Sequence, residues 1–222
     1  MKNIDEKVLK NFGDEWTSYD QSLLSEKEAK DLFDRYFSIF PSEFLQNNKV
    51  GIDIGCGSGR WAQHIAPFVK ELHCVDASSQ ALNIARKNLK GIDNCIFTQI
   101  PTDSLISLEK KFDFGYALGV LHHIPDAQKA LCDCISILKK DAPFLVYLYY
   151  AFDNKPIWYR VIWKITDPIR LLISKSSFPV KKFITSIIAF FVYLPFSRLA
   201  LLFDRLGIRS ENLPLSSYKN NS

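Results

Sequence analysis

The sequence predicts an α/β protein with a doubly wound, mostly parallel sheet. Short apolar runs typical of buried strands alternate with segments whose apolar residues recur at helical spacing. One such run, residues 50–54, leads directly into a turn with glycines at alternate positions, Gly55, Gly57 and Gly59. Alternating strands and helices give parallel strands joined by crossover helices. A glycine-rich turn at the carboxyl end of a strand is where such sheets bind nucleotide-like ligands.

Residues 49–150 form the predicted core domain. We expect strands at 50–54, 72–75, 95–100, 112–118 and 144–150, and helices at 61–69, 81–89 and 127–138. The last strand is continuously apolar, which is typical of strands buried on both faces. This alternation of five strands with helices predicts one parallel sheet.

Residues 1–48 are predicted to form an N-terminal arm and helices. Ser25 and Glu28 have the spacing of a capping box, which marks the start of a helix. The apolar residues that follow fall on one helical face until Pro41, which ends the helix. A second amphipathic stretch is expected from Leu45 onward, leading into the first strand.

Composition and charge narrow the class of protein. With 222 residues, of which 47% are hydrophobic, the chain can bury a full core. The net charge of +4 does not by itself indicate nucleic-acid binding. Residues 151–222 contain 11 basic and 4 acidic residues, so we place an organisational boundary near residue 151. The basic, apolar segment 151–222 is predicted to be a helical extension.

Five cysteines are scattered along the chain without the paired spacing of a metal site, so no metal is expected. The polar N-terminus Met1–Asp5 does not have the pattern of a secretory leader. Both observations favour a reducing, cytoplasmic location.

The spacing of the glycines indicates the kind of cofactor. A dinucleotide fingerprint requires a third glycine where this chain has Arg60, so an NAD-type oxidoreductase is disfavoured. The sequence instead reads D-x-G-x-G-x-G from Asp53. Asp76 ends the second strand 23 positions later, where an acidic side chain can accept hydrogen bonds from ribose hydroxyls. Alternatively, Asp76 or a following serine caps the next helix.

A second motif, L-G-V-L-H-H-I-P-D at residues 118–126, follows the fourth strand. Together with D-x-G-x-G-x-G, it resembles the class I S-adenosylmethionine (SAM) methyltransferases that act on small molecules or lipids. The resemblance spans about residues 12–150. It implies a Rossmann-like core, S-adenosyl-L-methionine as cofactor, and an enzyme that transfers a methyl group by in-line displacement.

The resemblance also implies roles for individual residues. The three glycines would admit the methionine end of the cofactor, and Asp53 would orient its ammonium group directly or through water. Asp76 would hold the ribose, while Leu118 and Gly119 would line the other side of the cofactor. The acidic residue that the family places near the adenine is replaced by Pro101, which leaves Asp103 as a substitute.

A further departure from the family lies before the fifth strand. The family's L-K-P-G-G turn is replaced by Leu138-Lys139-Lys140-Asp141-Ala142-Pro143. We expect this change to cost some local stability without affecting the cofactor.

His122 and His123 are the candidate catalytic residues. A base is needed only if the acceptor is a hydroxyl, a phenol or an acidic carbon, and histidine suits proton transfer near neutral pH. The alternative is that the two histidines shape the pocket or cap the following helix.

The C-terminal third predicts two helices, at 156–173 and 180–206, in which basic residues are mixed with tryptophan and tyrosine. They are interpreted either as a lid over the substrate pocket or as a face that contacts a membrane peripherally through residues 156–206. A transmembrane span is disfavoured, because it needs about 20 apolar residues and this run is broken by Pro195 and Arg198. A lipophilic acceptor would suit either interpretation.

No convincing strand follows Tyr150, so the family's sixth and seventh strands are predicted to be missing from a truncated or divergent chain. A rival hypothesis is therefore a regulatory protein that binds SAM without catalysis. Nucleic-acid methylation is disfavoured, because Leu118-Gly119-Val120-Leu121 stands where an N-P-P-Y-type tetrad would be.

Overall fold

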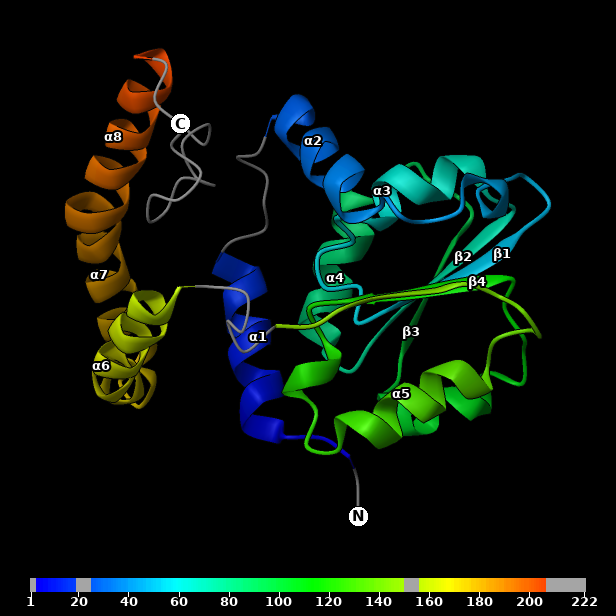
Figure 1. Cartoon of the computed structure of the whole chain (residues 1–222). Coiled ribbons are helices and arrows are strands. Elements are labelled where there is room, and N and C mark those ends of the chain that lie inside the picture. The colour runs from blue at the N-terminus through cyan, green and yellow to red at the C-terminus, as the bar shows by residue number, and fades with distance from the viewer. Residues whose placement is uncertain (1–2, 19–24, 150–155, 207–222) are drawn as a thin grey trace. The chain divides into compact units, whose positions relative to one another are not determined.

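Five parallel strands form the central sheet of the computed structural model (Figure 1). The structure describes residues 3–18, 25–149 and 156–206. The strands are β1 (Val50–Ile54), β2 (Glu71–Asp76), β3 (Cys95–Gln99), β4 (Phe114–Leu118) and β5 (Phe144–Tyr147). Their order in the sheet is β3-β2-β1-β4-β5. The chain winds outward from β1 to β3 and then returns to the other side of β1, which confirms the predicted doubly wound fold.

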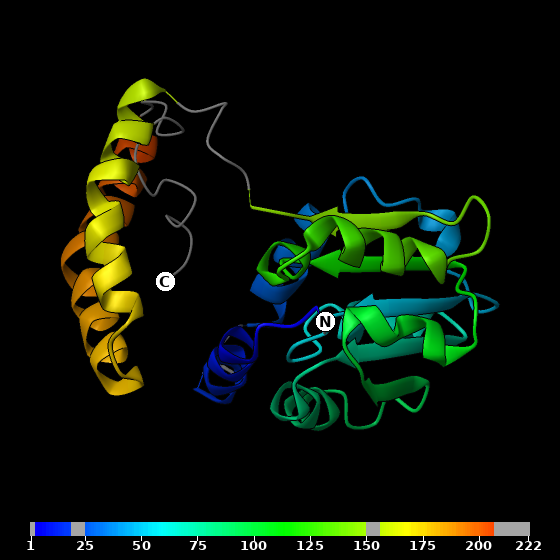
Figure 2. The same ribbon diagram turned by 90° about the horizontal axis from the view of Figure 1, so that it is seen from below.

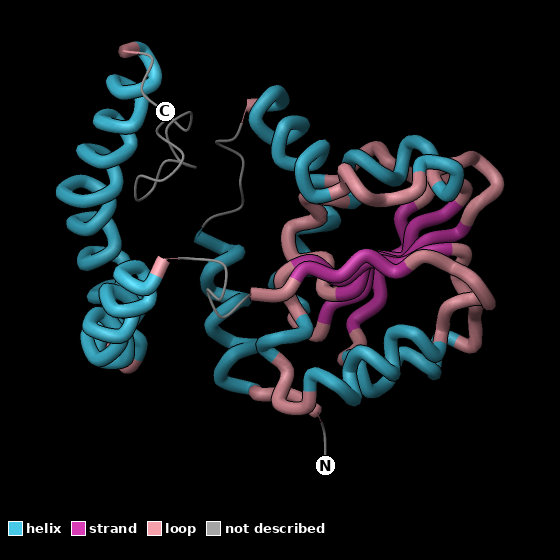
Figure 3. The backbone as a smooth tube through the Cα atoms, viewed as in Figure 1, coloured by secondary structure: helices cyan, strands magenta, loops and turns pink. Residues whose placement is uncertain are grey.

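Helices cover both faces of this sheet (Figure 3). On one face, α2 (Glu26–Tyr36), α3 (Ala62–Ile65) and α4 (Ser79–Asn88) enclose an apolar cluster with Trp61 and Tyr116. On the other face, α5 (Ala127–Ser136) and the 3-10 segment η3 (Thr102–Leu108) enclose a second cluster. Alternate residues of β1 face the second cluster: Ile52 and Ile54 belong to it, and the buried Asp53 lies between them in the strand.

Side-chain caps fix where the helices begin. The predicted capping box is confirmed: Ser25 Oγ accepts from the Glu28 N–H at 3.3 Å, and the Glu28 carboxylate accepts from the Ser25 N–H at 3.1 Å. Asp5 accepts from the first N–H groups of α1 (Glu6–Ser18) at 2.9 and 3.1 Å. The cap of α4 is Ser78, so Asp76 is not the capping residue.

One prediction about this unit was wrong. β5 is not buried on both faces: it is an edge strand, and Leu145 is its one buried residue. The amphipathic stretch predicted from Leu45 onward is not helical. It follows a 3-10 turn, η1 (Ser42–Phe44), and Phe44 and Leu45 pack on the core.

Two other connections differ in detail from the predicted ones. The helix predicted over 61–69 is α3 followed by the 3-10 turn η2 (Ala66–Phe68), because Pro67 has no N–H to continue the α-helix. Before β5, Asp141 has a φ of 60°, in the left-handed region that favours glycine. Asp141 thus takes the conformation for which the family uses a glycine.

Residues 151–222 form a second compact unit, distinct from Met1–Tyr150. Its described part contains α6 (Ile157–Ser174), α7 (Phe178–Ile188), a π-helical segment η5 (Ala189–Tyr193) and α8 (Leu194–Arg205). α7, η5 and α8 form one continuous helical rod, and α6 contacts α7 (Figure 2). Within the described ranges no strand follows Tyr147.

Candidate cofactor and acceptor site

A cleft lies at the carboxyl ends of β1, β2 and β4, where the strand order reverses. Doubly wound sheets bind ligands at this topological switch point. About 910 Å³ of space, part of it open solvent, lies between the atoms of the cleft. Gly55, Asp76, Leu118, Gly119 and His123 of the predicted site residues line it.

The three glycines of the turn serve different purposes. Gly55 lines the cleft at φ +72°, and a Cβ there would lie 2.4 Å from a methyl group of Val120. Gly57 donates its N–H to Asp76 at 3.0 Å. Gly59 faces away from the cleft, since its Cβ would meet Leu89 of the α4 end at 2.8 Å. The third glycine therefore allows the turn to pack on α4 rather than admitting a ligand.

Asp76 presents a carboxylate to the cleft with spare capacity to accept hydrogen bonds. One oxygen accepts from the Gly57 N–H at 3.0 Å and the other from the Ser78 N–H at 2.8 Å. An ionised carboxylate has about four acceptor sites, so each oxygen can take a further donor. Burial raises the pKa of Asp76 above its ordinary value. The arrangement suits a pair of vicinal hydroxyl donors.

Asp53 is buried beside the cleft rather than in its wall. The residue is 1% exposed, and its neighbour across the strands is Tyr116 of β4. Neither Asp53 Oδ2 nor the Tyr116 hydroxyl has a hydrogen-bond partner among the described residues. Burial raises the pKa of Asp53 well above its ordinary value. Such an unpaired carboxylate oxygen can accept from a water molecule or an ammonium group at this end of β1.

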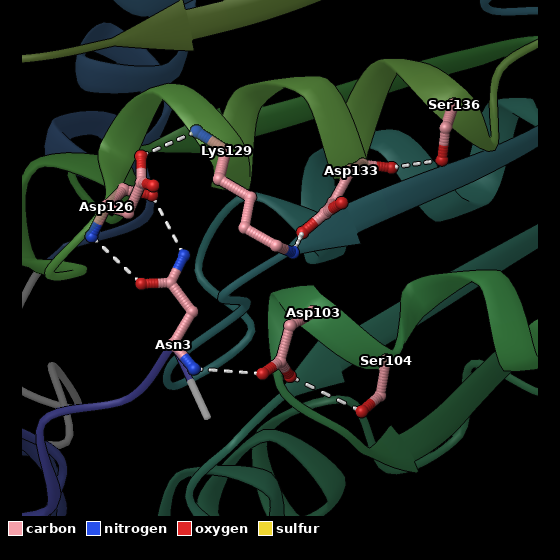
Figure 4. A network of polar contacts seen from close by, with 7 residues as sticks. All are labelled: Asn3, Asp103, Ser104, Asp126, Lys129, Asp133 and Ser136. Carbon is pink, nitrogen blue, oxygen red and sulfur yellow. Dashed lines mark hydrogen bonds and ion pairs between the residues drawn. The ribbon is translucent and has the colours of Figure 1, made fainter. Parts of the chain in front are cut away.

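Asp103 is not brought to the cleft. Its Oδ2 accepts from the backbone N–H of Asn3 at 2.9 Å (Figure 4). The Asn3 side chain also joins α5, because its Nδ2 donates to the Asp126 carbonyl and its Oδ1 accepts from the Asp126 N–H, both at 2.9 Å. We call these three hydrogen bonds the Asn3 clamp. Pro101 and Thr102 line the cleft where Asp103 was expected.

The Asn3 clamp fixes the start of α1, which covers part of the cleft. Ile4, Val8, Leu9 and Phe12 contribute apolar side chains to its lining. Sequence reasoning missed these residues. Their helical spacing after a capping aspartate could have indicated an amphipathic helix, but not the surface on which it packs.

The structure separates the two candidate histidines. His123 lines the cleft and meets the Phe12 ring edge-on at 4.8 Å between centroids. His122 stacks on Tyr149 at 4.1 Å, and neither of its buried ring nitrogens has a hydrogen-bond partner in the described part of the chain. Burial lowers the pKa of both, and His122 lowers that of His123 further. Both rings are therefore neutral at neutral pH, and only His123 can reach a ligand in the cleft.

Comparison with known proteins identifies the family. Residues 52–144 match the family described as a methyltransferase domain. This region, less than half of the 222 residues, is similar to the class I S-adenosylmethionine-dependent methyltransferases. The resemblance of the two sequence motifs to this family is thereby confirmed.

Two relatives of the chain illustrate the extent of the match. An uncharacterized methyltransferase, YcgJ of Bacillus subtilis (strain 168), is 33% identical over 105 residues, which cover 46% of this chain and 42% of the relative. A ubiquinone biosynthesis O-methyltransferase of Alkalilimnicola ehrlichii is 32% identical over 90 residues, 40% of this chain and 36% of the relative. The chain thus spans less than half the length of these relatives.

A solved structure supports the fold of the chain. The DhpI–SAH complex is 16% identical, with a TM-score of 0.50 over 63% of this chain and 67% of that one. At this identity the likeness concerns the fold alone.

The cleft fits S-adenosylmethionine, the cofactor of the matching family. Gly55 lets the Val120 side chain approach the turn closely, and a Cβ at Gly119 (φ +80°) would have no atom within 4 Å, so the cleft is open there. Asp76 can accept from two ribose hydroxyls, and apolar residues such as Val75, Ile100 and Leu105 can enclose a purine. Within residues 3–18, 25–149 and 156–206, no group of three acidic, His or Cys side chains is placed to hold a metal ion. All five cysteines are free thiols.

Proposed function

We propose that this chain transfers the methyl group of S-adenosylmethionine to a small-molecule or lipophilic acceptor. The observation that carries the proposal is the cleft at the switch point of the sheet, with Asp76 at one wall and His123 at another. A chain of this family with an intact glycine turn and ribose acceptor has what cofactor binding requires.

When bound, the cofactor supplies an activated methyl group, whose carbon forms a bond to the acceptor as the carbon–sulfur bond breaks to leave a neutral thioether. The protein must then hold the two reactants in line and exclude water, which contributes about 7–11 kcal/mol. In this chain Gly55 and Gly119 would hold the methionine end, and α1 would exclude water from the cleft. Asp76 would fix the ribose.

His123 would act as the base when the acceptor is a hydroxyl. Its neutral ring would take the proton that the acceptor oxygen loses as the new bond forms, and would pass it to solvent. His122 does not line the cleft, so we assign it a positioning role: it packs between His123 and Tyr149.

The surroundings of His123 favour a flat or lipophilic acceptor. Phe12, His122 and Tyr149 pack on it, and Tyr147 extends this aromatic group to Tyr36 of α2. The relative named as a ubiquinone biosynthesis O-methyltransferase is compatible with a phenolic acceptor. We therefore propose a phenol with an apolar substituent, met in the cytoplasm or at the inner face of a membrane.

Calorimetry with SAM, S-adenosylhomocysteine (SAH) and NAD in parallel tests the cofactor assignment. Binding of the first two without NAD is expected, and binding of NAD alone would overturn it. Transfer of a labelled methyl group from SAM to catechol and to a prenylated catechol then tests the activity. Cofactor binding without transfer to either would favour the rival, a SAM-binding protein without catalysis.

Replacing His123 with alanine is expected to lower methyl transfer to a phenol by about 100-fold, the size of a general-base contribution. The affinity for SAH should change much less, because the base contacts the acceptor. In the unaltered chain, activity should fall as the pH drops below His123's pKa, which lies below its ordinary value of about 6.5. A pH–rate profile with no acid limb, or equal losses of affinity and turnover, would contradict the base role.

Replacing Asn3 with alanine is expected to weaken SAH binding by about tenfold. The change removes the two side-chain hydrogen bonds of the Asn3 clamp, each with a net value of about 0.5–1.5 kcal/mol. Lys10→Ala, on the exposed face of α1, is the control and should leave the affinity unchanged. Calorimetry of both variants decides; equal affinities would mean that the clamp does not hold α1 over the cofactor.

A further inference from the structure

The rod formed by α7, η5 and α8 is too apolar for a surface exposed to water. Its segment Pro179–Phe203 is 25 residues long; the most apolar 18 residues within it have a mean hydropathy of 1.9, and 6% of that window is buried. By length and composition alone, this segment could cross a membrane. Phe183, Phe190 and Phe191 are each more than 60% exposed. Contiguous exposed apolar surface of this kind marks a contact with another molecule or with lipid.

Basic residues flank the apolar part of the rod. Residues 183–197 contain no charged side chain, Lys181 and Lys182 precede them, and Arg198 follows. At 1.5 Å per residue this uncharged stretch is about 22 Å long, shorter than the ~30 Å hydrocarbon core of a bilayer. The rod can therefore lie in one leaflet with its basic ends at the headgroups, whereas a span of about 20 residues would have to carry Arg198 into the hydrocarbon core.

α6 shows the pattern of an interfacial helix. Val161, Ile165, Ile169 and Leu172 recur at helical spacing and are all exposed, while Arg160 and Lys164 lie on another face. Trp158 and Trp163 are also exposed. An amphipathic helix with basic residues on one face and bulky apolar residues on the other binds the headgroup region of anionic membranes.

The charge of this segment favours lipid, rather than a second copy of the chain, as the partner that covers the apolar surface. Residues 157–206 contain eight basic and two acidic residues, so two such surfaces would repel each other. Anionic lipid headgroups supply the opposite charge, at about 1 kcal/mol per basic residue near the surface.

We propose that residues 156–206 dock on an anionic bilayer, with the uncharged stretch of the rod inserted into one leaflet and α6 lying in the headgroup region. The proposal is independent of the methyl-transfer function, since lipid binding is measured without cofactor or acceptor.

Flotation of the full chain with vesicles tests docking. With vesicles of phosphatidylcholine and phosphatidylglycerol, we expect co-flotation that persists in high salt after binding, because inserted apolar side chains are not released by screening. Vesicles of phosphatidylcholine alone should bind at least about tenfold more weakly. Release by salt would overturn insertion, and no co-flotation at low salt would overturn docking.

Paired variants separate insertion from charge. Phe190→Glu with Phe191→Glu should abolish flotation. Ile39→Glu with Phe68→Glu is the matched control, since it makes the same charge change at exposed apolar residues of the other unit. Lys181→Glu with Lys182→Glu should weaken binding to the anionic vesicles by at least about tenfold. Unchanged flotation of the Phe190/Phe191 variant would overturn the proposal.

Quenching by lipids brominated on their acyl chains gives a second readout. In a Trp16→Phe background, fluorescence of Trp158 and Trp163 should be quenched on binding. Adding Trp158→Phe with Trp163→Phe should remove that quenching, since the remaining Trp61 is 5% exposed in the core. The proposal fails if no quenching occurs and light scattering shows an oligomer that the Phe190→Glu/Phe191→Glu double variant no longer forms. The apolar surface would then be a protein interface.

Discussion

Replacing Asp76 with alanine is expected to weaken SAH binding by at least about 100-fold. The variant would lose the acceptors for two ribose hydroxyls, and hydrogen bonds to a charged group contribute about 1.5–3 kcal/mol each. It would also free the Gly57 N–H, which the carboxylate holds at 3.0 Å, so that the glycine turn keeps only its backbone hydrogen bonds to Val75 of β2. Calorimetric titration with SAH measures the effect.

Asp113→Ala is the matched control for Asp76→Ala. Asp113 also accepts from a backbone N–H, that of Val50 at 2.9 Å, and pairs with Lys139 at 2.8 Å. It precedes β4, however, at the opposite end of the strands from the cleft. We expect this variant to lower the free energy of unfolding but to keep its SAH affinity. A similar loss of affinity in both variants would mean that Asp76 acts only through stability.

Replacing Gly55 with alanine is expected to be the most destabilising single change in the glycine turn. An L-residue at φ +72° costs about 1–2 kcal/mol, and forcing a Cβ to within 2.4 Å of the Val120 side chain adds about 1–3 kcal/mol of overpacking. Urea unfolding gives the change in free energy, and SAH titration of the folded variant shows whether the cleft is closed.

The Gly91→Ala variant separates the cost of a positive φ from the cost of overpacking. Gly91 has a φ of +93°, but a Cβ there would have no atom within 4 Å, so this variant carries the backbone cost alone. In addition, the double variant Gly55→Ala with Val120→Ala should recover part of the loss, because it removes the methyl groups that clash. If Gly55→Ala and Gly91→Ala lower the free energy of unfolding equally, and the double variant recovers nothing, the close approach to Val120 does not contribute to the destabilisation.

The core could be predicted from sequence because its signals are local. The strand at 50–54, its glycine turn and the capping box at Ser25 each depend on residues close together in the chain. The wrong predictions concern position in the sheet or packing at a distance. An apolar run such as β5 reads as buried whether it lies at the centre or at the edge, since the order of the strands decides.

Site residues that lie at the end of a strand could be predicted from the sequence. Site residues that depend on contacts between distant segments were missed. Asp76 and Gly55 follow directly from the strand–turn pattern, and both line the cleft. The role of Asn3 depends on its contacts with Asp103 and Asp126, 100 and 123 positions away. No local pattern encodes such contacts. The same limit applied to Asp103, whose carboxylate was taken for a ligand contact but fixes the N-terminal segment instead.

The position of α1 links cofactor exchange to the kinetics of the whole cycle. Because Ile4, Val8 and Phe12 belong to the cleft wall, a movement of α1 away from the cleft would widen the exit for a nucleoside as large as SAH. Such a movement would break the three hydrogen bonds of Asn3 together. Opening of such covers takes microseconds to milliseconds and often sets the turnover number of enzymes. In this chain the residence time of the spent cofactor, rather than the methyl transfer, would set the pace.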